Sequence, residues 1–205
     1  MSALEIKYKP INKDEWLPDR CLSFLKPLYV SDIVPEGGCP SFSLSYTNGD
    51  RKLLEKLYHE ALTRYGCCGY VAWNGDNVVG HHTFFPFVLA REIRFYGWRD
   101  NEQPIYTETL VHNCISLIND SKYRRKGIGS NLVRKSLKWA KLAGWKRFEV
   151  HKVLPDNGKA YSSEQKSCVT FWKKLGFSIF RSSKAADELM KLYDVSQVYS
   201  MFLDL

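Results

Sequence analysis

The stretch from residue 107 to residue 144 restricts the fold more than any other part of the chain. Residues 107–118 are rich in β-branched and other apolar side chains, which favours a strand. Residues 131–143 carry an apolar face with a helical repeat and end before Gly144, which predicts an amphipathic helix. Between them lies the segment Arg124-Arg125-Lys126-Gly127-Ile128-Gly129. A strand, a glycine-rich loop and a helix in this order predict an α/β fold.

Hydrophobic periodicity and turn residues predict the other elements. Strands are expected at residues 5–11, 69–73, 78–85, 145–153, 177–181 and 198–203, with a further strand and a loop between 89 and 106. Helices are expected at residues 16–30, 51–65, 164–175 and 184–193, and residues 31–50 are expected to form a loop. Because no repeat or linker is visible in the 205 residues, we expect a single domain over residues 1–205, with an elaborated N-terminal half.

The composition, with 44% hydrophobic and 25% charged residues, is that of a globular protein. The longest apolar run, residues 84–90, is too short to span a bilayer and contains Pro86, which excludes a membrane-spanning protein. Residues 1–10 lack the apolar core of a secretory signal, so we expect a cytoplasmic location.

The six cysteines are expected to be thiols in a reducing compartment, and most of them to be buried. Cys67 and Cys68, together with His81 and His82, could in principle bind zinc. Their spacing is not that of a zinc finger, so no metal site is predicted.

The positive charge of the chain is concentrated in one segment. The net charge is +8, but residues 122–152 contain 11 of the 30 basic residues and only one of the 22 acidic residues. The rest of the chain is slightly acidic. A basic segment of this kind favours a polyanionic partner, such as a nucleic acid, an anionic membrane surface or a phosphate-rich cofactor, although it can also be a solvated helix face.

The position of Gly127 and Gly129 just before a helix favours a phosphate group as the ligand. Glycines allow a close backbone approach to an anion, and the N-terminus of the following helix presents free N–H groups to it. A dinucleotide-binding fingerprint would need a third glycine at Leu132, and no segment has the glycine and lysine spacing of a P-loop. Neither of these rival phosphate loops fits the sequence.

Two segments between about residues 110 and 177 resemble the GNAT acyltransferase superfamily. They are Tyr123-Arg124-Arg125-Lys126-Gly127-Ile128-Gly129-Ser130-Asn131-Leu132 and Phe171-Trp172-Lys173-Lys174-Leu175-Gly176-Phe177. The resemblance implies a mixed, mostly antiparallel central sheet flanked by helices. It also implies acetyl-CoA as co-substrate and direct transfer of its acetyl group to a primary amine in a ternary complex. The acceptor would be a small molecule or a peptide.

The resemblance also implies which residues contact the co-substrate. Its pyrophosphate would lie on the loop formed by Arg124, Arg125, Lys126, Gly127, Ile128, Gly129 and Ser130. The backbone N–H groups of Leu117 and Ile118 would hold the oxyanion. Gln165 and Trp172 stand where the superfamily commonly has Asn and Tyr.

The strand before the loop supplies the candidate general base. The resemblance places a base at or beside His112, a residue type that titrates near neutral pH. Strand alternation puts His112 on one face, expected to line a cleft, together with Glu108, Leu110, Cys114 and Ser116, and puts Val111, Ile115 and Leu117 on a core face. Glu108 is the second candidate, and a core role for His112 is the alternative.

The chain departs from the superfamily at the general acid, because Trp172 cannot donate a proton to the departing sulfur. The thiolate would leave without a protein acid, or Tyr161, Ser167 or Cys168 would replace the tyrosine. The departure also favours an alternative function, a catalytically degenerate module that binds CoA. Nucleic-acid binding is disfavoured because no RNA- or DNA-binding motif is evident.

The sequence leaves open the roles of two segments and the oligomeric state. Residues 84–106 could line an aromatic acceptor pocket or pack in the core, and residues 154–163 could form part of the acceptor site or a surface loop. A homodimer is also possible.

Overall fold

The structure is a computed structural model that describes residues 5–12, 51–90, 107–117, 121–156, 168–185, 187, 190 and 194–205. The helix expected at residues 16–30, the loop at residues 31–50 and most of residues 89–106 and 154–163 lie outside the described residues.

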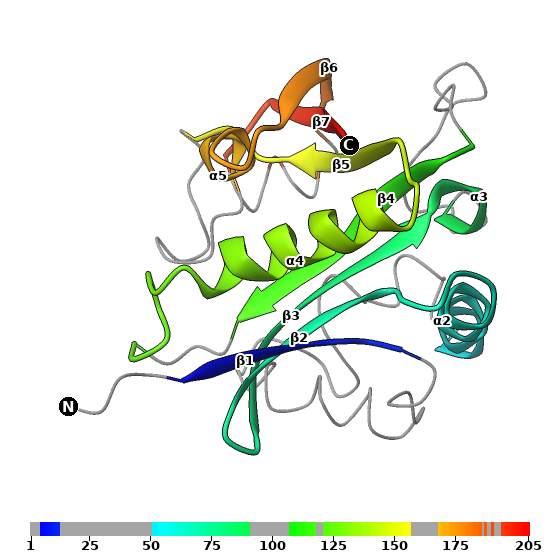
Figure 1. Cartoon of the computed structure of the whole chain (residues 1–205). Helices are drawn as coiled ribbons and strands as arrows, with labels where there is room; N and C mark the ends of the chain where they lie inside the picture. The colour runs from blue at the N-terminus through cyan, green and yellow to red at the C-terminus, as the bar shows by residue number, and fades with distance from the viewer. Residues whose placement is uncertain are drawn as a thin grey trace.

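A seven-stranded sheet forms the centre of the described part of the chain (Figure 1). Its strands are β1 (Ile6–Pro10), β2 (Gly69–Asn74), β3 (Asn77–Pro86), β4 (Thr109–Leu117), β5 (Arg147–Val153), β6 (Ser178–Lys184) and β7 (Gln197–Asp204). They lie in the order β1-β2-β3-β4-β5-β7-β6. Among the described strands, only the pair β4–β5 is parallel. The expected mixed, mostly antiparallel sheet is therefore confirmed.

Helices cover both faces of this sheet. They are α2 (Arg51–Tyr65), α3 (Phe87–Ala90), α4 (Ile128–Leu142) and α5 (Val169–Lys173). One core joins α2 to Phe85 and Val111, and another joins α4 and α5 to Phe84 and Leu110. Neighbouring residues of a strand thus face opposite layers, and α4 crosses the sheet on the near side in Figure 1.

The two longest described helices confirm the predictions made from the periodicity of the sequence. The helix α2 has the bounds predicted for it. The helix α4 begins three residues before the predicted start, because Gly127 adopts a left-handed φ of 75° and serves as its N-cap. It ends before Gly144, whose φ of 85° terminates it as expected. No helix among the described residues is long and apolar enough to cross a membrane.

The segment after β3 corrects one prediction. A strand and a loop are expected within residues 89–106, but residues 89 and 90 belong to the single helical turn α3, and residues 91–106 lie outside the described residues. Pro86 is the last residue of β3, and it has no N–H with which to continue the ladder. Phe87, Leu89 and Ala90 are then buried against α2, so packing fixes a turn that the sequence pattern did not indicate.

The strand β4 corrects a second prediction. Thr83 of β3 pairs with Cys114, whereas Phe84 pairs with His112, so Asn113 is an extra residue in β4. Such a bulge reverses the alternation of side chains beyond it. Ile115 and Leu117 consequently face α4, where an added Cβ on Gly129 would meet them at 3.5 and 3.6 Å. The single face predicted from Glu108 to Ser116 is therefore wrong beyond His112.

Candidate active site

The loop before α4 has the backbone shape of an anion cradle. Gly127 has φ 75° and makes no side-chain cap, and Arg125 two residues earlier also has a positive φ, 55°. The N–H groups in the first helical turn, from Ile128 onwards, have no acceptor within the helix. A Cβ built on Gly127 would meet no atom within 4 Å. The helix N-terminus therefore has an open side that only glycine leaves uncovered.

Side chains around this loop fix its position and supply positive charge. The buried Tyr123 accepts a hydrogen bond from Asn74 Nδ2 at 2.9 Å, which ties the loop to β2. Arg125 and Lys126 are exposed, and Arg124 is half-buried. The loop thus combines a helix N-terminus with three cations, an arrangement suited to a phosphate group.

The parallel strands β4 and β5 separate part of the way along β4. Their pairing runs from Thr109 opposite Arg147 to Val111 opposite Glu149, and stops there. His112 is the first residue of β4 beyond the paired segment. Its ring lies edge-on to Trp172 of α5, with the ring centroids 5.0 Å apart. The pairing of the two strands therefore ends next to a histidine.

His112 is backed by a second histidine and a serine. His112 Nδ1 lies 3.1 Å from Nε2 of His82 on β3, and His82 Nδ1 lies 2.7 Å from Ser136 Oγ on α4. His82 and Ser136 are fully buried, and His112 is half-buried.

Burial keeps both imidazoles in the neutral form. Burial lowers the pKa of His112 to about 3, helped by the nearby His151 and His81. Burial also lowers the pKa of His82 well below its usual value, and repulsion from His112 and His81 adds to this effect. His112 is therefore a much weaker base than the near-neutral histidine that the sequence suggested.

Trp172 is fully buried, and its Nε1 has no hydrogen-bond acceptor among the described residues. A buried N–H group without an acceptor costs free energy unless a ligand or water completes it. Trp172 packs against His112, at the end of the β4–β5 pairing. The predicted contact residue therefore lies beside the predicted base.

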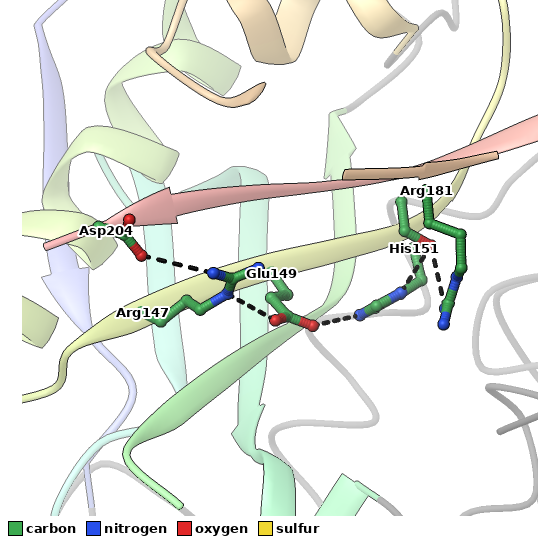
Figure 2. Close-up of polar contacts among 6 residues, drawn as sticks. Arg147, Glu149, His151, Arg181 and Asp204 are labelled. Atoms are coloured by element: carbon green, nitrogen blue, oxygen red, sulfur yellow. Dashed lines mark hydrogen bonds and ion pairs between the residues drawn. The ribbon is translucent and has the colours of Figure 1, made fainter. Parts of the chain in front are cut away.

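A charged network occupies the other face of β5 (Figure 2). Arg147 Nε donates to Glu149 Oε1 at 2.7 Å, and Glu149 Oε2 lies 3.1 Å from His151 Nε2. His151 Nδ1 lies 3.0 Å from Ser200 Oγ on β7, which also accepts a hydrogen bond from Arg181 Nη2 at 3.3 Å. Burial lowers the pKa of His151, whereas the hydrogen bond to Glu149 opposes this shift.

His151 lies within a β-bulge of β5. The register of β5 against β7 shifts between Val150 and Val153, and Lys152 has φ 55°. Sequence reasoning missed this network, and it also missed His82 and Ser136 as partners of His112. The adjacent histidines at positions 81 and 82 are the signal in the sequence, and there their pattern indicates only a possible zinc ligand pair.

The structure does not bring Glu108 to His112. Glu108 is exposed and precedes β4, where it lines a surface pocket of about 460 Å³ with Tyr65 and Trp145. Four residues of strand span about 13 Å. The Leu117 side chain lies 3.6 Å from a Cβ built on Gly129, at the start of α4. Ile118 and Gln165 lie outside the described residues.

The described cysteines are thiols rather than disulfides, and three of the four are buried. Burial raises the pKa of the Cys67 thiol to about 11, which makes it a poor nucleophile or metal ligand at neutral pH. Within the described ranges, no group of three or more His, Cys, Asp or Glu side chains could hold a metal ion.

Comparisons with solved structures agree with this fold. The chain is similar to the acetyltransferase of the GNAT family from Streptococcus pneumoniae, with a TM-score of 0.59 and 14% identity over 98% of this chain and 99% of that one. It is also similar to Ard1 from Thermoplasma volcanium, with a TM-score of 0.56 and 16% identity over 98% and 97% of the two chains. A putative GNAT acetyltransferase from Desulfovibrio desulfuricans has a TM-score of 0.57 and 14% identity over 98% and 99%.

No curated protein matches the sequence. The model of the acetyltransferase (GNAT) family matches residues 39–177, which is more than half of the chain and includes the glycine loop, α4 and α5. With this match, the sheet topology and the loop geometry, the chain belongs to the GNAT family of acetyltransferases.

Proposed function

We propose that this protein is an acetyl-CoA-dependent N-acetyltransferase that acts on a primary amine of a small molecule or a peptide. The observation that carries the proposal is the open helix N-terminus at Gly127, flanked by Arg124, Arg125 and Lys126 and found within a domain of the acetyltransferase family.

The residues present fit a CoA pyrophosphate. The backbone N–H groups of residues 127–130 supply hydrogen-bond donors, and Arg124, Arg125 and Lys126 supply charge. The N–H groups of Leu117 and Ile118 stay our proposal for the oxyanion contact, and Gln165 for a further contact. Trp172 Nε1, which has no acceptor among the described residues, suits an acceptor atom of the bound co-substrate. Acetyl-CoA supplies an activated thioester whose carbonyl carbon can accept an amine.

We propose His112 as the residue that accepts the proton of the amine. It stands where β4 and β5 part, beside Trp172. Its pKa of about 3 means that its lone pair is available at every physiological pH, although its basicity is low. It therefore suits an amine that arrives neutral and loses its proton as the C–N bond forms. Glu108 is the second candidate, and its distance along β4 counts against it.

No protein acid is proposed for the leaving group. The thiol of CoA has a pKa near that of cysteine, about 8.5, so its thiolate is a fair leaving group without protonation. Cys168 is a poor substitute, because burial and its hydrogen bond to Asp156 raise the pKa of its thiol.

A matched pair of glycine variants tests the phosphate loop. In Gly127→Ala, the new Cβ would occupy the open side, in a left-handed conformation that costs a non-glycine residue about 1–2 kcal/mol. CoA affinity measured by calorimetry should fall about tenfold or more. In Gly129→Ala the Cβ points at Ile115 and Leu117 instead, so the affinity should change little. Equal affinities for the two variants would remove the assignment.

A degenerate CoA-binding module is the second candidate function, and two observations favour it. Trp172 replaces a proton donor, and the pKa of His112 is low. Thiol release from acetyl-CoA in the presence of a broad panel of amines separates the two functions. Turnover with any amine supports the enzyme, whereas tight CoA binding without thiol release across the panel supports the module.

A further inference from the structure

The contacts behind His112 form a chain through three elements. Ser136 Oγ on α4 donates to the carbonyl oxygen of Leu132 at 3.1 Å and lies 2.7 Å from His82 Nδ1 on β3. His82 Nε2 then lies 3.1 Å from His112 Nδ1 on β4. Every contact in the chain is buried or half-buried, so water does not compete freely for these atoms.

One assignment of protons satisfies all three contacts at once. A serine hydroxyl has a single hydrogen, and a carbonyl oxygen can only accept, so that hydrogen goes to Leu132. Ser136 Oγ must then accept from His82 Nδ1–H. A neutral imidazole carries one N–H, so His82 Nε2 has only a lone pair and accepts from Nδ1–H of His112. The same rule leaves the lone pair of His112 on Nε2.

The neutrality of both rings, on which this count depends, has a physical cause. His82 and His112 have each other as ring partners, and His81 and His151 also lie near enough to lower the pKa of His112. Glu149, the carboxylate of the neighbouring strand, is paired with Arg147 and His151. A second proton on either ring would turn it into a positively charged imidazolium in contact with the other imidazole.

We propose that His82 and Ser136 are positioning residues that hold His112 with its proton on Nδ1 and its lone pair on Nε2. This inference rests on the proposed function, because it names the nitrogen that receives the proton of the amine. In that step the lone pair of the amine nitrogen would form the C–N bond, and the thioester C–S bond would break with its electron pair leaving on the CoA sulfur. The amine N–H bond would break with its electron pair kept by nitrogen, and the proton would bind to Nε2 of His112. His112 Nδ1–H stays hydrogen-bonded to His82 throughout.

The direct test is the protonation of each ring nitrogen, measured by ¹⁵N–¹H NMR on histidine-labelled protein. In the unmutated chain we expect the ¹⁵N shifts of a protonated Nδ1 and an unprotonated Nε2 for both His82 and His112. A protonated Nε2 on His112 would overturn the inference.

The Ser136→Ala variant removes the oxygen that keeps the proton on His82 Nδ1. We expect the N–H of His82, and with it that of His112, to shift toward Nε2. For histidines that bind a metal, loss of an outer hydrogen-bond partner lowers activity by roughly 10–100-fold, and we expect a loss of roughly tenfold here. We expect this loss in kcat, with the CoA dissociation constant unchanged. Unchanged His112 shifts in this variant would also contradict the proposal.

Two further variants separate positioning from packing. His82→Phe keeps a buried ring but removes the acceptor for His112 Nδ1–H, whereas His82→Gln can return an oxygen near the position of Nε2. Activity should be lower in His82→Phe than in His82→Gln, and equal activities would favour a packing role. Ser200→Ala is the matched control, because it removes a buried hydroxyl from His151 and should leave the His112 shifts unchanged.

The failure of this inference is distinguishable from the failure of the proposed function. The proposed function fails if the unmutated chain turns over no amine. The inference fails if the NMR spectra place the proton on the wrong nitrogen of His112.

Discussion

His112 on β4 and His151 on β5 lie close enough to affect each other electrostatically, yet they have opposite kinds of partner. His112 Nδ1 contacts Nε2 of His82, which is itself a neutral imidazole held by a serine. His151 contacts the carboxylate of Glu149, and two arginines complete its network. Burial lowers the pKa of both, but only His151 has a carboxylate that opposes the shift.

The difference shows that the sheet holds a charged network and a pair of neutral imidazoles on opposite faces. Phe148 and Val150 of β5 face the core under α4, while Arg147, Glu149 and His151 alternate onto the other face. A buried charge is stable when an opposite charge and hydrogen bonds surround it. The charged network therefore gathers on one face of β5, and the imidazole pair stays uncharged on the α4 side.

The largest difference expected between the two histidines is in how acid changes the free energy of unfolding. The pKa of His81 is lowered to about 4 and that of His112 to about 3, so the unfolded chain binds protons first as the pH falls below about 6.5. Each such histidine should lower the free energy of unfolding by roughly 1.4 kcal/mol per pH unit between pH 6.5 and its folded-state pKa, and should have no effect above that window.

Urea unfolding at a series of pH values measures this slope. His112→Gln should remove about one proton from the pH dependence, and His151→Gln should remove less, because Glu149 opposes the lowering of the pKa of His151. Equal slopes for the two variants would contradict the difference between His112 and His151.

Removal of the carboxylate on the β5 side should have the next largest effect. Glu149→Gln would leave Arg147 and His151 without their buried anion, which should reduce the free energy of unfolding by about 3 kcal/mol or more. Denaturant unfolding at pH 7 measures the loss. A change below about 1 kcal/mol, the range of a surface ion pair, would mean that water reaches the network.

The two serines should show smaller effects of similar size. Ser136→Ala and Ser200→Ala each remove a buried hydroxyl that contacts an imidazole, and each should cost about 1–2 kcal/mol. Ser136→Ala should cost more, because His82 is fully buried, whereas the half-buried Arg181 can turn toward water. Thermal unfolding of the two variants at one pH ranks them, and the reverse order would contradict this difference in burial.

The smallest effect is expected at the rim of the charged network. The Asp204 side chain is 72% exposed and lies 3.6 Å from Arg147 Nη1. Asp204→Asn should change the free energy of unfolding by less than about 0.5 kcal/mol. A loss as large as that of Glu149→Gln would mean that the network depends on its exposed edge.

The sequence predicted the elements whose signals are local. The apolar repeat of residues 51–65 gave the bounds of α2, and the hairpin turn between residues 74 and 77 gave β2 and β3. The glycine loop was predicted because glycine readily adopts a positive φ and has no side chain to cover the N-terminus of the helix. Failures occurred at residues 87–90 and at Asn113, where packing against neighbouring elements changed the local pattern.

The α/β class, the glycine loop before a helix and the resemblance to the GNAT superfamily follow from the sequence alone, because each of these depends on residues that are close along the chain. Only the tertiary structure decided what surrounds His112. His82 lies on β3 and Ser136 on α4, and both are distant from His112 along the chain. The carboxylate of Glu149 lies on the other face of β5, where it contacts His151. The basicity of a side chain depends on burial and on neighbouring charges, and a linear sequence specifies neither until the sheet has formed.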